Sequence, residues 1–233
     1  TKGQEDYLRM ERGIQTYLGY SYSDRLHLAT HVHNKPLVPM DRIRGVTERV
    51  DLFGDVIIPL YENEVRQAIN ELLDEGIDYL CVNLLYAYRN PKHENRIKEI
   101  AAEVFAERRE SVPVFLASEL YPVRRDFPRL NTLLVEAYAA EPSREQLNKV
   151  NAANKELGAK YEMRVMASHG GTIGIEAKQL ARTLVSGPIG GVVGAKYLSD
   201  LLGSKNVVCT DIGGTSFDLA LITNGEYQIK NQP

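Results

Sequence analysis

At residues 207–218 the chain reads Val207-Val208-Cys209-Thr210-Asp211-Ile212-Gly213-Gly214-Thr215-Ser216-Phe217-Asp218. Residues 207–210 are an apolar run that favours a strand, and the carboxylate of Asp211 follows at the end of this strand. Two glycines follow, and because glycine has no side chain, backbone N–H groups can turn there toward an anion. The pattern predicts a strand that leads into a phosphate-binding loop at residues 211–215.

This loop carries the groups that polyphosphate chemistry needs. Asp211 is predicted to hold a hydrated Mg²⁺ or to orient an attacking group, and the hydroxyls of Thr215 and Ser216 to bond phosphate oxygens. Gly213 and Gly214 leave room for the phosphates. The alternative interpretation is a plain hairpin turn in which Asp211 caps its own backbone. Isolated Gly-Gly turns are common, so the surrounding sequence has to decide.

A second strand-to-loop transition lies upstream, where the strand predicted at 164–167 runs into Ser168-His169-Gly170-Gly171-Thr172. The two loops follow strands that can lie side by side in one sheet, and our hypothesis is that they face one site. His169, Gly170 and Gly171 are therefore candidate phosphate-contacting residues. The alternative is an ordinary tight turn with His169 as a solvated or capping residue.

The rest of the chain alternates helices with strands. Apolar stripes predict helices, and continuous apolar runs predict strands covered on both faces. The helices are expected at 65–73, 90–105, 130–140, 144–157, 176–181 and 186–202, and the main strands at 77–85, 114–117, 164–167, 207–210, 217–222 and 227–230. This order indicates an α/β fold with a mostly parallel sheet and a final hairpin that turns at Asn224-Gly225. A domain break is expected near residue 160, between regions 1–160 and 161–233.

Three further patterns have weaker functional signals. The glycines of Ser186-Gly187-Pro188-Ile189-Gly190-Gly191-Val192-Val193-Gly194 do not fit the dinucleotide-binding fingerprint, and we expect them to let a helix pack closely on the sheet. His31 and His33 have strand-like spacing, but solvated loop histidines are favoured over a metal site. A basic cluster, Arg124, Arg125 and Arg129, is interpreted as an ion-paired surface or a subunit contact rather than an anion site.

Composition excludes several classes of protein. A length of 233 residues with 43% hydrophobic content allows one large core or two modest ones. The net charge of -3 gives no basic excess for nucleic-acid binding. No apolar run approaches the roughly 20 residues that span a bilayer, and Cys81 and Cys209 suit a reducing compartment. We expect a soluble, cytoplasmic protein, and because the chain starts without Met, a piece of a longer one.

Several segments resemble the hydantoinase/oxoprolinase family. Residues 210–222 are similar to its second phosphate loop, and residues 184–195 to the helix before that loop. Similarity to the acetone carboxylase β-subunit branch is carried by residues 17–20, 37–39, 136–144 and 164–172. The resemblance implies an actin-like ATPase fold of the ribonuclease H-like type. It also implies that the first phosphate loop lies upstream of Thr1 and the adenosine-binding part beyond Pro233.

That branch of the family joins acetone and bicarbonate as acetoacetate and forms AMP and phosphate from ATP. The resemblance therefore implies a subunit that binds ATP and Mg²⁺, with Asp211 as its catalytic and metal-binding residue. Its partners would be the acetone carboxylase α and γ subunits, with a Mn²⁺ centre on α and not on this chain. The isolated chain would be inactive. Two alternatives stay open, an ATP-dependent hydantoinase or 5-oxoprolinase subunit and a non-catalytic docking segment with Tyr17, Tyr20 and Tyr22 at the contact.

Overall fold

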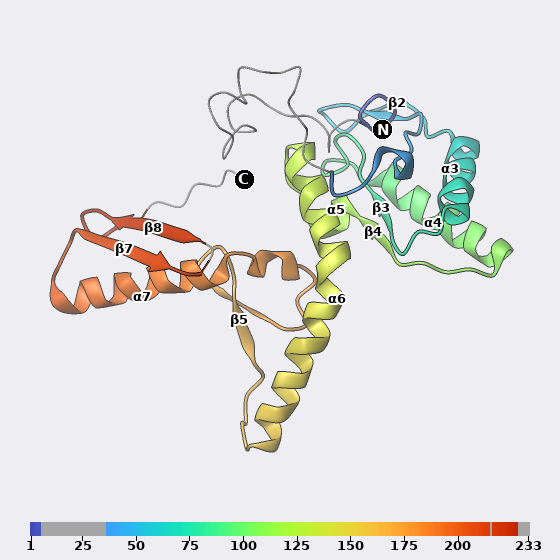
Figure 1. The fold of residues 1–233 in the computed structure, drawn as a ribbon. Coiled ribbons are helices and arrows are strands. Elements are labelled where there is room, and N and C mark those ends of the chain that lie inside the picture. Colours follow the sequence, from blue (N-terminus) through green and yellow to red (C-terminus); the bar gives the residue numbers. More distant parts are fainter. Residues whose placement is uncertain (6–35, 215, 228–233) are drawn as a thin grey trace. The chain divides into compact units, whose positions relative to one another are not determined.

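The computed structural model describes residues 1–5, 36–214 and 216–227. They fall into two compact units, Thr1–Leu134 and Val135–Pro233, and both mix helices with strands (Figure 1). None of the helices in this part of the chain is both long and apolar enough to cross a membrane. The domain break predicted near residue 160 is a separate expectation, and it stays a prediction.

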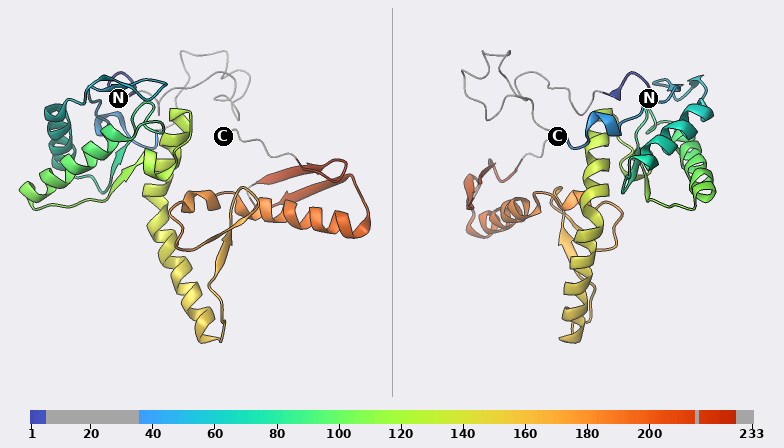
Figure 2. Two further views of the ribbon diagram at one scale, coloured as in Figure 1. Left: turned by 180° about the vertical axis from the view of Figure 1, so that it is seen from behind. Right: turned by 45° about the vertical axis from the view of Figure 1, so that its right-hand side comes forward.

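The first unit is built around a β-α-β motif. Its elements are η2 (Met40–Arg42), β1 (Arg49–Val50), β2 (Val56–Ile58), α3 (Glu62–Asp74), β3 (Leu80–Val82), α4 (Lys92–Arg108), β4 (Val114–Leu116), α5 (Ala117–Leu120) and the start of α6 (Asp126–Glu156). Strands β3 and β4 pair in parallel, with α4 as the crossover between them. Helices α3 and α4 lie side by side (Figure 2), and their apolar stripes form the core with residues such as Ile69, Leu80, Ile100 and Leu116.

A buried polar cluster lies at the carboxyl ends of β3 and β4. The Glu94 carboxylate is fully buried and accepts hydrogen bonds from the Leu84 N–H (2.9 Å), the Ser118 N–H (2.9 Å) and the Ser118 hydroxyl (2.6 Å). The equally buried Arg129 donates to Leu84 O (2.7 Å) and pairs with Asp126. Glu94 thus has hydrogen-bond donors and Arg129 has acceptors and an ion-pair partner. Buried charged groups need such partners in a low-dielectric interior.

The second unit contains two hairpins and a helix. Its elements after α6 are β5 (Arg164–Met166), β6 (Thr172–Gly174), η3 (Leu180–Thr183), α7 (Ser186–Leu202), β7 (Val207–Ile212) and β8 (Phe217–Ile222). Helix α7 ends at Gly203 in the left-handed conformation, and β7 then runs back along the helix. The Asn224-Gly225 turn is confirmed, since both residues have positive φ and Thr223 pairs with Glu226. The strand expected at 227–230 lies mostly outside the described residues.

The expected mostly parallel sheet is wrong for the described strands. They form four separate two-stranded sheets, of which only β3–β4 is parallel. The antiparallel pairs β5–β6 and β7–β8 are closed by residues 167–171 and 213–216. A connection that short cannot make the crossover that parallel pairing needs. Strands β5 and β7 therefore do not neighbour each other in one sheet, contrary to the hypothesis for the two glycine loops.

Two helix predictions around Pro142 are also wrong. The helices expected at 130–140 and 144–157 form one continuous helix, α6, with Pro142 inside it. A proline in a helix interior costs about 3 kcal/mol because it lacks an N–H and crowds the preceding turn. Contacts on both sides offset this cost: Glu136 accepts from the Leu180 and Ala181 N–H groups, and Arg144 donates to Ile175 O. The helix expected at 176–181 is replaced by the short η3.

Candidate functional site

The β7–β8 hairpin positions the predicted phosphate loop. Its register sets Asp211 directly opposite Asp218, on the hairpin face that also carries Val207, Cys209 and Ile222. This face packs toward α7, and Ile222 is fully buried there. Because β7 runs antiparallel to α7, the loop lies toward the N-terminal end of that helix (Figure 1). Asp211 is exposed and Asp218 is half-buried.

The two glycines of the loop keep space open outside it. Gly213 donates its N–H to Ser216 O at 3.0 Å, which closes the hairpin. An added Cβ at Gly213 would lie 3.6 Å from Ser216 O, and at Gly214 it would meet nothing within 4 Å. Neither glycine has positive φ, so the backbone itself does not demand glycine. The missing side chains instead leave the approach to the loop free, as a phosphate ligand requires.

The two aspartates could ligate a divalent cation whose remaining ligands come from a nucleotide. Like charges directly opposite each other on a hairpin destabilise it by about 0.2–1 kcal/mol, and a bound cation removes that repulsion. Mg²⁺ prefers oxygen ligands and is commonly held by one or two carboxylates plus substrate phosphates. Within the described ranges no group of three or more His, Cys, Asp or Glu could hold a metal alone. Phosphate oxygens would therefore have to supply ligands beside Asp211 and Asp218.

Asp218 was not among the residues that the sequence analysis proposed for the site, although it lies opposite Asp211. The signal was present in the quoted segment, since a four-residue connection between two strands makes positions 211 and 218 cross-strand partners. Ser216, which was predicted, lies near this pair, with its hydroxyl 3.4 Å from Asp218 Oδ2. Thr215 lies outside the described residues, so its predicted role stays a prediction.

The second glycine loop is the tight turn of the β5–β6 hairpin. Ala167 donates its N–H to Gly171 O (2.8 Å), and Gly170 takes a positive φ of 85°. His169 is exposed, and its ring folds over Gly171, where an added Cβ would lie 2.8 Å from Nε2. An added Cβ at Gly170 would lie 3.7 Å from Val193 on α7. The turn thus packs on the same helix as β7, and its contact with phosphate stays a proposal.

The glycines of α7 do not pack as expected. An added Cβ at Gly190 would make an ordinary contact with Met166 on β5, at 3.8 Å. At Gly187, Gly191 and Gly194 it would meet nothing within 4 Å. The prediction of close helix–sheet packing is therefore wrong for these three positions, because the helix presents them to open space.

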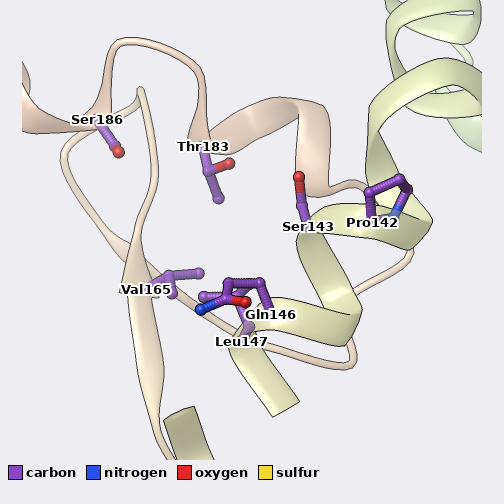
Figure 3. Close-up of a pocket in the computed structure, with 7 residues that line it drawn as sticks. All are labelled: Pro142, Ser143, Gln146, Leu147, Val165, Thr183 and Ser186. Carbon is purple, nitrogen blue, oxygen red and sulfur yellow. The ribbon is translucent and has the colours of Figure 1, made fainter. Parts of the chain in front are cut away.

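An uncharged hollow separates α6, β5 and the chain before α7 (Figure 3). Its volume is about 540 Å³. The lining residues are Pro142, Ser143, Gln146, Leu147, Val165, Thr183 and Ser186. With no charged side chain among them, the hollow does not supply the cations or carboxylates expected around Mg-ATP. None of its lining residues belongs to β7 or β8, which carry the aspartate pair.

The remaining candidates do not form sites in the described residues. Arg129 is a buried structural residue, whereas Arg124 and Arg125 are exposed, so the three do not act as one basic cluster. The ion pair expected for this group exists at Arg129, but in the interior and not at the surface. His31, His33 and the tyrosines at 17, 20 and 22 lie outside the described residues.

Comparison with known proteins decides the family. Two family models match the chain, Hydantoinase/oxoprolinase at residues 129–233 and Hydantoinase/oxoprolinase N-terminal region at residues 1–105. The acetone carboxylase beta subunit of Xanthobacter autotrophicus is 52% identical over 232 residues, which cover 100% of this chain and 32% of that protein. The chain belongs to the hydantoinase/oxoprolinase family.

Solved structures of similar proteins agree with this assignment. The nucleotide-free structure of acetone carboxylase, described with the mechanism of ATP-dependent acetone carboxylation, matches with a TM-score of 0.86 and 52% identity over 100% of this chain and 33% of that one. The ATP-dependent caprolactamase of Pseudomonas jessenii matches with a TM-score of 0.73 and 28% identity over 95% of this chain and 31% of that one. The chain thus spans about a third of the length of these relatives.

Proposed function

We propose that this chain is part of the ATP-binding subunit of an acetone carboxylase, which joins acetone and bicarbonate as acetoacetate and forms AMP and phosphate. One observation carries the proposal, the 52% identity to an acetone carboxylase beta subunit along the whole chain. The fold belonging to this function is the actin-like ATPase type, divided near residue 160. The mixed α/β content and the family support that fold.

In this proposal the β7–β8 hairpin is the second phosphate loop. Asp211 and Asp218 hold Mg²⁺, and Asp211 orients the phosphoryl group that is transferred. The open space beside Gly213 and Gly214 admits the phosphates, and the hydroxyls of Thr215 and Ser216 bond their oxygens. His169, Gly170 and Gly171 approach from the β5–β6 turn. Bound ATP supplies the phosphoryl groups that activate the ketone and bicarbonate.

The proposal also includes partner subunits and assigns Mg²⁺ and Mn²⁺ to different subunits. The α and γ subunits of the carboxylase would assemble with this one in the cytoplasm, and Mn²⁺ would be held on α. The first phosphate loop and the adenosine-binding part would belong to polypeptide outside this sequence. The similar protein of Xanthobacter autotrophicus is a beta subunit, which supports a multi-subunit assembly.

The test uses the intact protein assembled with its partner subunits. Acetone, bicarbonate and Mg-ATP are supplied, and acetoacetate and AMP are quantified by chromatography. Both products are expected, and each should disappear when ATP or bicarbonate is omitted. An assembled complex that forms no acetoacetate would reject the proposal.

A second candidate function is ATP-dependent hydrolysis of a cyclic amide. The match to the caprolactamase structure favours it, although at 28% identity. This enzyme would open caprolactam, a hydantoin or 5-oxoproline without bicarbonate. Assaying ring opening on the same complex separates the two reactions. The docking-segment alternative predicts that partner subunits are retained by the chain while neither reaction depends on Asp211.

A further inference from the structure

The second unit contains a hollow between parts of the chain that are far apart in sequence (Figure 3). Its volume of about 540 Å³ lies within the range of about 300–1,000 Å³ that is usual for small-molecule sites. On α6 the pairs Pro142–Gln146 and Ser143–Leu147 are each four residues apart, so the members of each pair are neighbours on one side of the helix. The residues across from them are Val165 on β5, Thr183 at the end of η3 and Ser186 at the start of α7.

Three polar side chains of the hollow have no hydrogen-bond partner in the part of the chain that the structure describes. They are Ser143, Gln146 and Ser186. The side chains of Ser143, Gln146 and Thr183 project into the space between α6, β5 and η3 (Figure 3). A hydroxyl both donates and accepts, and a side-chain amide does the same through separate atoms. The hollow therefore presents free hydrogen-bonding groups from α6 and from the start of α7.

Thr183 narrows the choice of ligand, because its hydroxyl proton is already used. The hydroxyl donates to Leu180 O at 2.7 Å, and a hydroxyl has one proton to donate. The oxygen of Thr183 can therefore only accept a hydrogen bond from a ligand. Ser143 and Gln146 are still able to donate. A bound molecule thus needs a donor for Thr183 and an acceptor for the α6 side chains.

The remaining properties of the lining set the charge and shape of the ligand. None of the lining residues is charged, and a charged group that leaves water without an opposite charge beside it is costly. The half-buried Leu147 and Val165 present apolar surface. The lining therefore matches an uncharged molecule in which a donor and an acceptor lie beside an apolar body.

The backbone between Thr183 and Ser186 is held in an unfavourable conformation. Val185 has a φ of 60°, in the left-handed region that β-branched residues rarely adopt. Its side chain is 64% exposed, so burial of that side chain does not offset the strain. The turn at Val185 joins η3 to α7, and the residues on its two sides, Thr183 and Ser186, line the same hollow. Strained backbone of this kind is concentrated at functional sites, where its geometry is needed.

We propose that the hollow binds a small uncharged molecule that carries a hydrogen-bond donor and an acceptor on an apolar body. In a primary carboxamide on a ring, for example, the N–H group donates to Thr183 Oγ1 and the carbonyl oxygen accepts from Ser143 or Gln146. The ring then packs against Leu147 and Val165. Binding is reversible and involves no chemical step. The inference does not depend on the proposed carboxylase activity.

The test compares three probes of nearly equal size in NMR titrations of the intact protein, expressed from its complete gene. Benzamide offers a donor and an acceptor, acetophenone an acceptor alone, and benzoate a negative charge. Benzamide is expected to bind with a Kd on the order of 1 mM. Acetophenone and benzoate should each bind at least about fivefold more weakly. Binding of either within about fivefold of benzamide overturns the proposal. So does the absence of saturable benzamide binding, which is the result if further polypeptide fills the hollow.

Thr183→Val locates the site, because it keeps the shape of the side chain and removes the accepting oxygen. The affinity for benzamide should fall at least about fivefold, while the affinity for acetophenone stays within about twofold. A structural disturbance would weaken both probes alike, and equal weakening of the two overturns the proposal. Thr132→Val is the matched control, since the Thr132 hydroxyl also donates to a backbone carbonyl, Pro128 O at 2.9 Å, but does not line the hollow.

A second variant serves if Thr183→Val does not fold, as judged by circular dichroism. Ser143 is exposed on α6, so Ser143→Trp places a large ring in the hollow without crowding the core. Saturable benzamide binding should then be lost. Binding that survives Ser143→Trp, or that falls as much in Thr132→Val as in Thr183→Val, places the ligand elsewhere and overturns the proposal.

Discussion

At Asp211 one substitution separates the charge of the side chain from its size. Asp211→Asn keeps the shape and removes the charge that would organise Mg²⁺ and the transferring phosphoryl group. Since phosphoryl transfer depends mainly on positioning and electrostatic stabilisation, turnover by the assembled enzyme is expected to fall on the order of a hundredfold or more. ATP-dependent acetoacetate formation measures it, and circular dichroism checks the fold.

The matched control is Asp200→Asn on the exposed end of α7, where Asp200 pairs with Lys196. Its activity should equal that of the wild type. If Asp211 merely caps the hairpin turn, asparagine can replace it, and activity stays within about a few-fold of wild type. That outcome would remove Asp211 from the mechanism.

Arg129 is expected to matter for stability. Its buried guanidinium donates to Asn83 Oδ1 (3.1 Å), Val123 O (3.0 Å) and Leu84 O (2.7 Å) and pairs with Asp126. Arg129→Met leaves these acceptors without donors and should lower the free energy of unfolding by about 3–5 kcal/mol. Urea denaturation measures the loss. The exposed Arg124→Met is the control, and a loss of similar size there would contradict the argument.

Glu94 gives a pH-dependent test. Burial is the main cause that raises the pKa of its carboxyl above the usual value of 4.5, against the opposing effect of the Ser118 hydrogen bonds. The folded state therefore binds the proton more tightly, so this group's stabilisation is complete below about pH 4.5 and is lost as pH rises through the raised pKa. Glu94→Gln removes the titration.

The difference in unfolding free energy between the wild type and Glu94→Gln should consequently grow as pH falls from 8 toward about 4.5. At pH 7 the variant should already be about 1–3 kcal/mol less stable, because the amide sets a donor against the N–H of Leu84 or Ser118. Urea denaturation at several pH values provides the data. A difference that shrinks on acidification would show the opposite sign of pKa shift.

At the scale of single elements, local signals predicted more than long-range ones. Helix 186–202 and strand 217–222 were predicted with the bounds that the structure has, since an apolar period and a nearby Ser-Gly-Pro or Asn-Gly act within a few residues. Helix α6 was split wrongly because the contacts that offset Pro142 come from residues 175–181, far along the chain. The β7–β8 pairing is local, through the short connection at 213–216, but a hairpin turn was predicted there only as the alternative to a phosphate loop. The partnership of Asp211 with Asp218 follows from that pairing, so it was missed too.

The Asn224-Gly225 turn provides a test at this scale. Gly225 has a φ of 80°, and an added Cβ would meet no atom within 4 Å, so any cost of Gly225→Ala is conformational and not steric crowding. Destabilisation of about 1–2 kcal/mol is expected. Gly174→Ala is the control, because its added Cβ also meets nothing and its φ is not positive. Thermal unfolding measures both, and equal effects would contradict a conformational origin.

At the scale of the whole molecule, the proposed function assigns only part of a nucleotide site to the described residues. In that proposal the carboxylate pair and the glycine loop would supply ligands from one side of the phosphates. The hollow that Pro142, Gln146 and Ser186 help to line carries no charged side chain. In the same proposal the facing phosphate loop and the adenosine-binding part would belong to polypeptide outside this sequence.

This division predicts how the 233-residue chain binds nucleotide by itself. Contacts from one loop alone leave most of the triphosphate and the base solvated, so Mg-ATP should bind with a Kd of about 1 mM or weaker, near 4 kcal/mol of binding free energy. Isothermal titration calorimetry of the chain measures this, beside the intact protein as a positive control and with circular dichroism to establish folding. Affinity depends on several groups that are held in place around the ligand. Supplying the missing loop should therefore restore binding more than adding positive charge to this chain. Micromolar binding by the folded chain would mean that it holds a complete site, and the half-site account would then be wrong.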